Sequence, residues 1–198
     1  MPKSALRYSV GAVIVHGKSE LLLVKYITTN LHLPIKIIAR DNGRSSIQIN
    51  GLKAFLDKNP YNDLKAFAKE YNVEYDRKNK RLKNFKIFVI MDTDDCNDAI
   101  KESYISGRLF KGHPLEEYIV PVFNTPNLEE VMKKANIITK QYHIASKGTY
   151  YSRIFPINTQ PLSHDTINQV KTFADKVKGI RDTNILEFID YCIEKIPA

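Results

Sequence analysis

The sequence predicts a three-layer α/β protein, in which helices cover both faces of an open, mainly parallel sheet of four strands. Two observations lead to this prediction. Short β-branched apolar runs recur along the chain, and amphipathic helical patterns separate them. The runs are continuously apolar, which is typical of strands buried on both faces, as in a parallel sheet.

The strands are expected at residues 9–15, 34–39, 85–91 and 118–124. Pro121 favours an edge position or a bulge in the last strand, because proline cannot donate a ladder hydrogen bond. Helices are expected at residues 20–31, 47–57, 98–110, 127–137 and 184–196, with Ser19 as the N-cap of the first. Residues 59–84 are polar and suggest a connector. The strand–helix alternation places a core at residues 1–137, and residues 138–198 form a mostly helical C-terminal extension packed on it.

Composition indicates which kinds of partner the protein binds and in which cellular compartment it is found. The chain has 198 residues and a net charge of +8, a mild excess that favours anionic partners. No segment is apolar for long enough to span a membrane, so no membrane partner is expected. Cys96 and Cys192 are far apart and fit neither a disulfide framework nor a zinc site. A reducing, cytoplasmic location is therefore expected.

Polar residues follow each predicted strand. His16, Asp41, Asp92 and Asn124 lie at or just after the four strand ends. Parallel strands bring their carboxyl ends to one edge of the sheet, and open α/β sheets bind ligands there. These positions are therefore expected to converge on a binding site.

The stretch Asp92-Thr93-Asp94-Asp95 carries the strongest chemical signal. If the strand extends through it, Asp92 and Asp94 point to the same side, because side chains alternate with period two. Two hard oxygen ligands with little sulfur or imidazole nearby suit Mg²⁺ or Mn²⁺, and phosphate oxygens usually complete such sites. The alternative is a polar turn in which Asp95 or Asn97 caps the next helix.

Three segments together resemble a TOPRIM domain, the metal-binding fold of topoisomerases, primases and several nucleases. Residues 15–20 (VHGKSE) match its first motif in Gly17, Lys18 and Glu20, and residues 37–46 (IIARDNGRSS) resemble its glycine-bearing second loop. Asp92 and Asp94 match its Asp-x-Asp, and the resemblance covers roughly residues 10–135. Within the superfamily the chain is most similar to RloB-like and overcoming-lysogenisation-defect (OLD) nucleases of phage defence and mobile elements, whose Pro-x-x-Glu step resembles residues 126–129.

The resemblance implies a nuclease that depends on Mg or Mn and acts on DNA or RNA, and it leaves an oligomer open. It implies Glu20, Asp92, Asp94 and Glu129 as metal ligands. Catalytic roles would fall to His16, Glu20 and Lys18, and Lys18 would also contact a phosphate. Arg40 and Arg44 flank the second loop, where they either hold neighbouring phosphates or only make the surface soluble. His16 departs from the family, which has glutamate there. Imidazole can accept a proton near neutral pH, but it cannot bridge two magnesium ions as a carboxylate can.

Two other functions remain open at this stage. One is a catalytically weak TOPRIM-like protein that binds nucleic acid or regulates, and the other is a small-molecule phosphohydrolase. Residues 77–86 hold six cations and no acid, and they are either a solvated face or a phosphate-facing patch. Four aromatic residues of the extension either stack on bases or fill the core, namely Tyr142, Tyr150, Tyr151 and Phe155.

Overall fold

A parallel sheet of four strands forms the middle of the molecule in the computed structural model, which describes residues 8–138 and 147–197. Its strand order is β2-β1-β5-β6. The strands are β1 (Gly11–Val15), β2 (Ile35–Ile38), β5 (Lys86–Asp92) and β6 (Ile119–Asn124). All neighbouring pairs in this sheet are parallel. The predicted α/β fold class, with its open sheet and covering helices, is thereby confirmed.

The buried strands are the ones with the longest apolar runs. β1 lies between β2 and β5, and all of its residues are buried. Val13 and Val15 face one hydrophobic cluster, whereas Ala12 and Ile14 face the other, as period-two alternation requires. β6 is an edge strand, so the predicted edge position of Pro121 is confirmed.

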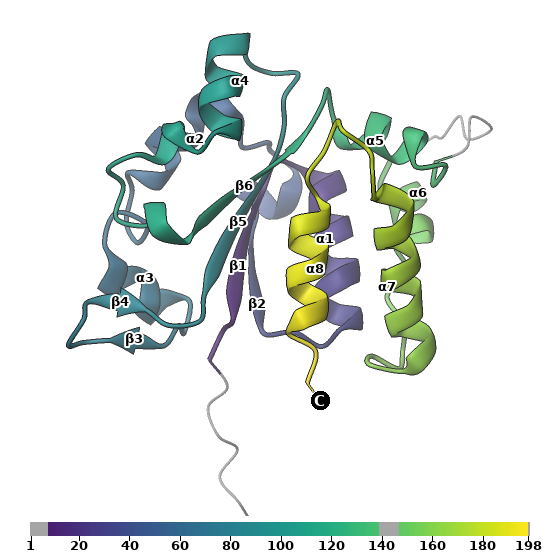
Figure 1. Cartoon of the computed structure of the whole chain (residues 1–198), viewed down its shortest axis with the longest axis horizontal. Helices are drawn as coiled ribbons and strands as arrows, with labels where there is room; N and C mark the ends of the chain where they lie inside the picture. Colours follow the sequence, from purple (N-terminus) through teal and green to yellow (C-terminus); the bar gives the residue numbers. More distant parts are fainter. Residues whose placement is uncertain (1–7, 139–146, 198) are drawn as a thin grey trace, which may run out of the picture.

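Helices from both ends of the chain cover one face of the sheet (Figure 1). They are α1 (Lys18–Asn30), α5 (Leu128–Lys134), α6 (Lys147–Ile154), α7 (His164–Val177) and α8 (Leu186–Glu194). Side chains of α1, α7 and α8 belong to one continuous cluster with the strands. The helices of the C-terminal extension thus share the core of residues 8–138.

The other face is covered by the middle of the chain (Figure 1). The elements are α2 (Ile49–Leu56), α3 (Leu64–Glu70), α4 (Asp98–Ile105) and the antiparallel hairpin of β3 (Tyr75–Asp76) and β4 (Arg81–Leu82). The prediction of a polar connector at residues 59–84 was wrong. Phe67 of α3 and Leu82 of β4 are buried in the second cluster, so this segment is part of the packed layer.

Short 3₁₀ turns join several elements, at Arg40–Gly43, Arg108–Phe110 and Glu116–Tyr118. The helix predicted at residues 98–110 is therefore an α-helix that ends at Ile105 and is followed by a separate turn. Gly107 lies between the two with a positive φ of 75°, a backbone conformation that favours glycine. None of the helices in the described ranges is both long and apolar enough to cross a membrane.

Candidate metal centre

The carboxyl ends of the strands bring residues from distant parts of the chain to one edge of the sheet, at the top of Figure 1. His16 directly follows β1, Asp92 ends β5 and Asn124 ends β6. Asp92 and Asn124 are partners in the β5–β6 register. Arg40 and Asp41 follow β2 in the turn Arg40–Gly43. The predicted convergence on one edge is thus what the parallel register produces.

Glu20 points into this edge from the first turn of α1, and its side chain is 1% exposed. The helix begins at Lys18 with Gly17 as N-cap, so the prediction of Ser19 as cap was wrong. The physical reason is that Glu20 itself reaches back, and its Oε2 accepts a hydrogen bond from the Gly17 N–H at 2.9 Å. Its Oε1 is buried and has no hydrogen-bond partner among the described residues.

Asp92 is held in a similar way at the end of β5, and it is 7% exposed. Its Oδ1 accepts hydrogen bonds from the Leu128 N–H at 3.0 Å and from Asn124 Nδ2 at 3.3 Å. Leu128 is the first residue of α5, so the start of that helix fixes the carboxylate. Within the described residues, no hydrogen bond goes to Oδ2. Each of the two acids thus has one oxygen anchored and one oxygen available.

Burial and neighbouring negative charge make the ionised forms of Glu20 and Asp92 less favourable. Burial, and then the charge of Asp92, raises the pKa of Glu20 from an ordinary 4.5 to about 8. Burial raises the pKa of Asp92 to about 6, although the charge of His16 and the bonds from Asn124 and Leu128 oppose this shift. Glu129 adds to both shifts. A cation at this edge would remove this unfavourable interaction.

Glu129 reaches the same region from the first turn of α5. It is half-buried, and its Oε1 accepts a hydrogen bond from Ser19 Oγ at 3.3 Å. Tyr151 of α6 lies near Glu129. Burial raises the pKa of the Tyr151 hydroxyl most, and the charge of Glu129 raises it further. Tyr151 was predicted only to stack on bases or to fill the core, since no local pattern shows where α6 will pack. Tyr142 lies outside the described residues.

His16 and Asp95 form a second pair beside the acids. His16 Nδ1 lies 3.9 Å from Asp95 Oδ2, and both side chains are largely buried. Burial raises the pKa of Asp95, and the charge of His16 opposes that shift. Asp95 lies beside the start of α2, where Asn50 Nδ2 donates to the Asp95 backbone carbonyl at 3.0 Å. His16 is thus held close to, but not in hydrogen-bond contact with, a carboxylate.

Asp94 is placed differently from its prediction. β5 ends at Asp92, so the alternation that would align the two acids does not continue. Asp94 is exposed in the following turn, and its Oδ2 accepts a hydrogen bond from Asn127 Nδ2 at 3.0 Å. The predicted helix cap is also present, because Asn97 Oδ1 accepts from the Ile100 N–H at 3.0 Å. The stretch therefore provides both a buried acid and a helix cap.

The predicted phosphate-binding residues surround this edge from outside. Lys18, Arg40 and Arg44 are exposed. Gly43 holds the two loops together, because a Cβ on it would lie 3.0 Å from Leu21 Cδ2 and 3.3 Å from Lys18 Cα. Its φ of +77° also favours glycine. The loop that carries the arginines therefore packs directly on the start of α1.

The donor set fits a hard divalent cation. Glu20 and Asp92 both offer a carboxylate oxygen without a hydrogen bond among the described residues, and Mg²⁺ is commonly bound by one or two carboxylates, waters and phosphate oxygens. Within residues 8–138 and 147–197, no group of three His, Cys, Asp or Glu side chains is arranged to hold an ion as it stands. Two carboxylates completed by other oxygens are the arrangement that these residues allow.

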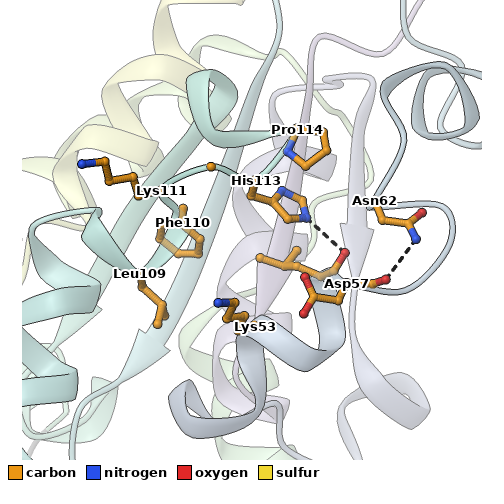
Figure 2. Close-up of a pocket in the computed structure, with 10 residues that line it drawn as sticks. Lys53, Asp57, Asn62, Leu109, Phe110, Lys111, His113 and Pro114 are labelled. Carbon is orange, nitrogen blue, oxygen red and sulfur yellow. Dashed lines mark hydrogen bonds between the residues drawn. The ribbon is translucent and has the colours of Figure 1, made fainter.

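A separate cavity of about 200 Å³ lies at the other end of α2, between its last turn and residues 109–114 (Figure 2). Lys53, Asp57 and His113 line it, and none of the predicted site residues does.

The chain was also compared with known proteins. No family model, no curated protein and no solved structure matches it.

Proposed function

We propose that this chain is a nuclease of TOPRIM type that hydrolyses phosphodiesters of DNA or RNA with the help of Mg²⁺ or Mn²⁺. One observation carries the proposal: Glu20 and Asp92, far apart in the sequence, are both buried and near enough for the charge of Asp92 to raise the pKa of Glu20, whose Oε1 has no partner among the described residues. Such an arrangement is unfavourable without a cation, so its presence is best explained by one that binds.

Glu20 and Asp92 would hold the cation, with Glu129 beside them and Asp94 at the entrance. A bound cation in such a site supplies charge stabilisation at a phosphoryl oxygen. His16 accepts the proton of the attacking water, and Asp95, at 3.9 Å, stabilises the imidazolium that results. Lys18 and the two arginines of the second loop orient neighbouring phosphates.

A nucleic acid fits the charge of the chain as the phosphodiester substrate. The net charge is +8, and the hairpin of β3 and β4 presents an exposed basic turn at residues 77–80. Phosphate contacts by lysine and arginine give sequence-independent affinity that falls with salt. Cys96 and Cys192 are both free thiols, which agrees with activity in a reducing compartment such as the cytoplasm.

One observation favours a second candidate, a nucleic-acid-binding or regulatory protein with weak chemistry. His16 occupies the position where the TOPRIM family has a glutamate, and its acidic partner is Asp95. The first motif therefore contributes one carboxylate, Glu20, in place of two. A site with fewer anionic ligands binds a divalent cation less tightly.

Cation titration by calorimetry, together with cleavage of single- and double-stranded DNA and RNA in Mn²⁺, distinguishes these functions. We expect the wild type to bind the cation and to cleave, and Asp92→Asn to lose at least ~100-fold in cleavage. The amide side chain of this variant keeps an oxygen for the Leu128 N–H, so folding is retained. Salt-dependent nucleic-acid binding without cleavage would support the second candidate, and hydrolysis of a phosphate monoester alone would contradict both.

A further inference from the structure

The C-terminal extension contributes a tyrosine to the acidic edge. Tyr151 lies on α6, which packs on α1, and it is 2% exposed. Its ring centroid is 5.7 Å from that of Phe155, which in turn contacts Tyr26 of α1. The hydroxyl is near enough to Glu129, Glu20 and Ser19 for each of them to affect its pKa. The ring thus lies in the core while the hydroxyl faces the acids.

The Tyr151 hydroxyl is buried and makes no hydrogen bond with both a normal distance and a normal angle among the described residues, although Ser19 and Glu129 are both near enough to interact with it. A buried hydroxyl without a well-formed hydrogen bond lowers stability, and phenylalanine would fill the same space without this cost. Glu20 Oε1, at the same edge, is also buried and has no hydrogen-bond partner among the described residues. Two buried polar atoms that lack partners at one edge point to a ligand that changes the arrangement when it binds.

Glu129 is the best acceptor for this hydroxyl. A carboxylate is a stronger acceptor than a serine hydroxyl, and the only hydrogen on the Tyr151 oxygen can go to one acceptor. Ser19 Oγ already donates to Glu129 Oε1, but the bond is long at 3.3 Å.

We propose that Tyr151 is a positioning residue of the cation site. When a divalent cation is bound, the Tyr151 hydroxyl donates a hydrogen bond to the Glu129 carboxylate and holds it toward the cation. This inference rests on the proposed function, since it needs a cation at Glu20 and Asp92. It makes α6, in the C-terminal extension, a part of the site, because this helix carries the residue that orients Glu129.

The first test compares Mn²⁺ affinity by calorimetry in the wild type, Tyr151→Phe and Tyr26→Phe. Hydrogen-bond partners of metal ligands typically contribute 10- to 100-fold in affinity, so we expect Tyr151→Phe to bind Mn²⁺ at least ~10-fold more weakly. Tyr26→Phe is the matched control, because Tyr26 belongs to the same aromatic cluster and burial alone raises its pKa. Its affinity should stay within about twofold of the wild type.

Thermal unfolding in EDTA separates positioning from a structural role. Tyr151→Phe removes a hydroxyl without a partner, so its Tm without cation should equal or exceed that of the wild type, while its gain in Tm with Mn²⁺ should be smaller. A lower Tm in EDTA together with unchanged Mn²⁺ affinity would mean that the hydroxyl is only structural, and the inference would fall.

A double substitution shows whether Tyr151 acts through Glu129. The affinity of Tyr151→Phe/Glu129→Gln should equal that of Glu129→Gln alone, and independent, multiplying losses would contradict the inference. The outcomes also separate the two proposals. A wild type that binds no divalent cation overturns both, whereas a wild type that binds Mn²⁺ only as tightly as Tyr151→Phe overturns the role of Tyr151 alone.

Discussion

Two histidines at opposite ends of helix α2 differ in how their ring nitrogens are satisfied. His113, in the cavity of Figure 2, accepts a hydrogen bond at Nδ1 from the Leu115 N–H at 3.1 Å. Its Nε2 must then carry the proton, and it lies 3.1 Å from the Leu56 carbonyl, to which it donates. His16, at the acidic edge, has a buried Nδ1 with no hydrogen bond among the described residues.

This difference supports the proposal that the acidic edge, and not the cavity, binds a ligand. In the cavity, backbone groups satisfy the histidine, and Asn62 likewise donates to the Asp57 carbonyl at 3.0 Å. At the edge, buried atoms of Glu20, Asp95 and Tyr151 are left without hydrogen bonds among the described residues. Buried polar groups are normally paired, so the unpaired ones are where the proposed cation or another partner from solution would bind. The better-formed cavity is therefore the less convincing site.

The largest effect that we expect is on stability as a function of pH. The pKa of Glu20 rises from 4.5 in the unfolded chain to about 8 on folding, so the folded state binds more protons between these values. The stabilisation is complete below pH 4.5 and is lost as pH rises toward 8, by up to about 5 kcal/mol. The Asp92 pKa, raised to about 6, acts in the same direction. Urea unfolding in EDTA at several pH values measures this.

Glu20→Gln is the control for that pH dependence. Glutamine keeps an oxygen for the Gly17 N–H but carries no charge, so the variant should be more stable than the wild type at pH 8 by about 4 kcal/mol. It should also bind no Mn²⁺. Equal stability of the two proteins at pH 8 would show that folding does not disfavour the charged form of Glu20.

Truncating His113 and truncating His16 should have different effects on the free energy of unfolding. His113→Ala leaves the Leu115 N–H and the Leu56 carbonyl without a partner, and we expect a loss of about 2 kcal/mol in the free energy of unfolding with unchanged Mn²⁺ affinity. His16→Ala should cost less than about 1 kcal/mol, because the ring makes no hydrogen bond with any residue that the structure describes. Equal losses in chemical denaturation would contradict the distinction between the two regions.

The smallest effect concerns the departure at position 16. His16→Glu adds a carboxylate next to Asp92, and we expect about tenfold tighter Mn²⁺ binding and faster cleavage, as more anionic ligands favour a cation. His16→Gln, of similar size but uncharged, should show no gain. Weaker binding by the glutamate variant would mean that the edge cannot accept a further acid, and that histidine is the residue this site requires.

Much of the fold could be predicted, because the strands are continuous apolar runs. The segment at residues 59–84 was missed although a signal was present. Asp63 caps α3, and Leu64, Phe67 and Tyr71 recur at helical spacing. High overall polarity concealed this short amphipathic helix. The two-residue strands β3 and β4 carry no detectable pattern of their own, since their pairing depends on packing beneath them.

Those parts of the candidate site that depend on the ends of strands and on local motifs could be predicted from the sequence. The end of a strand places Asp92 at the edge, and the motif around Gly17 places Glu20 beside it. The position of Asp94 was not predictable from alternation, because the strand ends two residues earlier than this required. The approach of Tyr151 depends on how α6 packs against α1, and no sequence spacing reveals such a contact between distant segments.

The hydrogen bond from the Gly17 amide to Glu20 gives the chain a built-in reporter. One carboxylate both closes the first turn of a helix and faces the other acids, so a proton or an ion that arrives at Oε1 draws electron density away from Oε2. The Gly17 amide resonance would therefore move with occupancy, and one peak in a ¹⁵N spectrum would follow the chemistry of the whole edge.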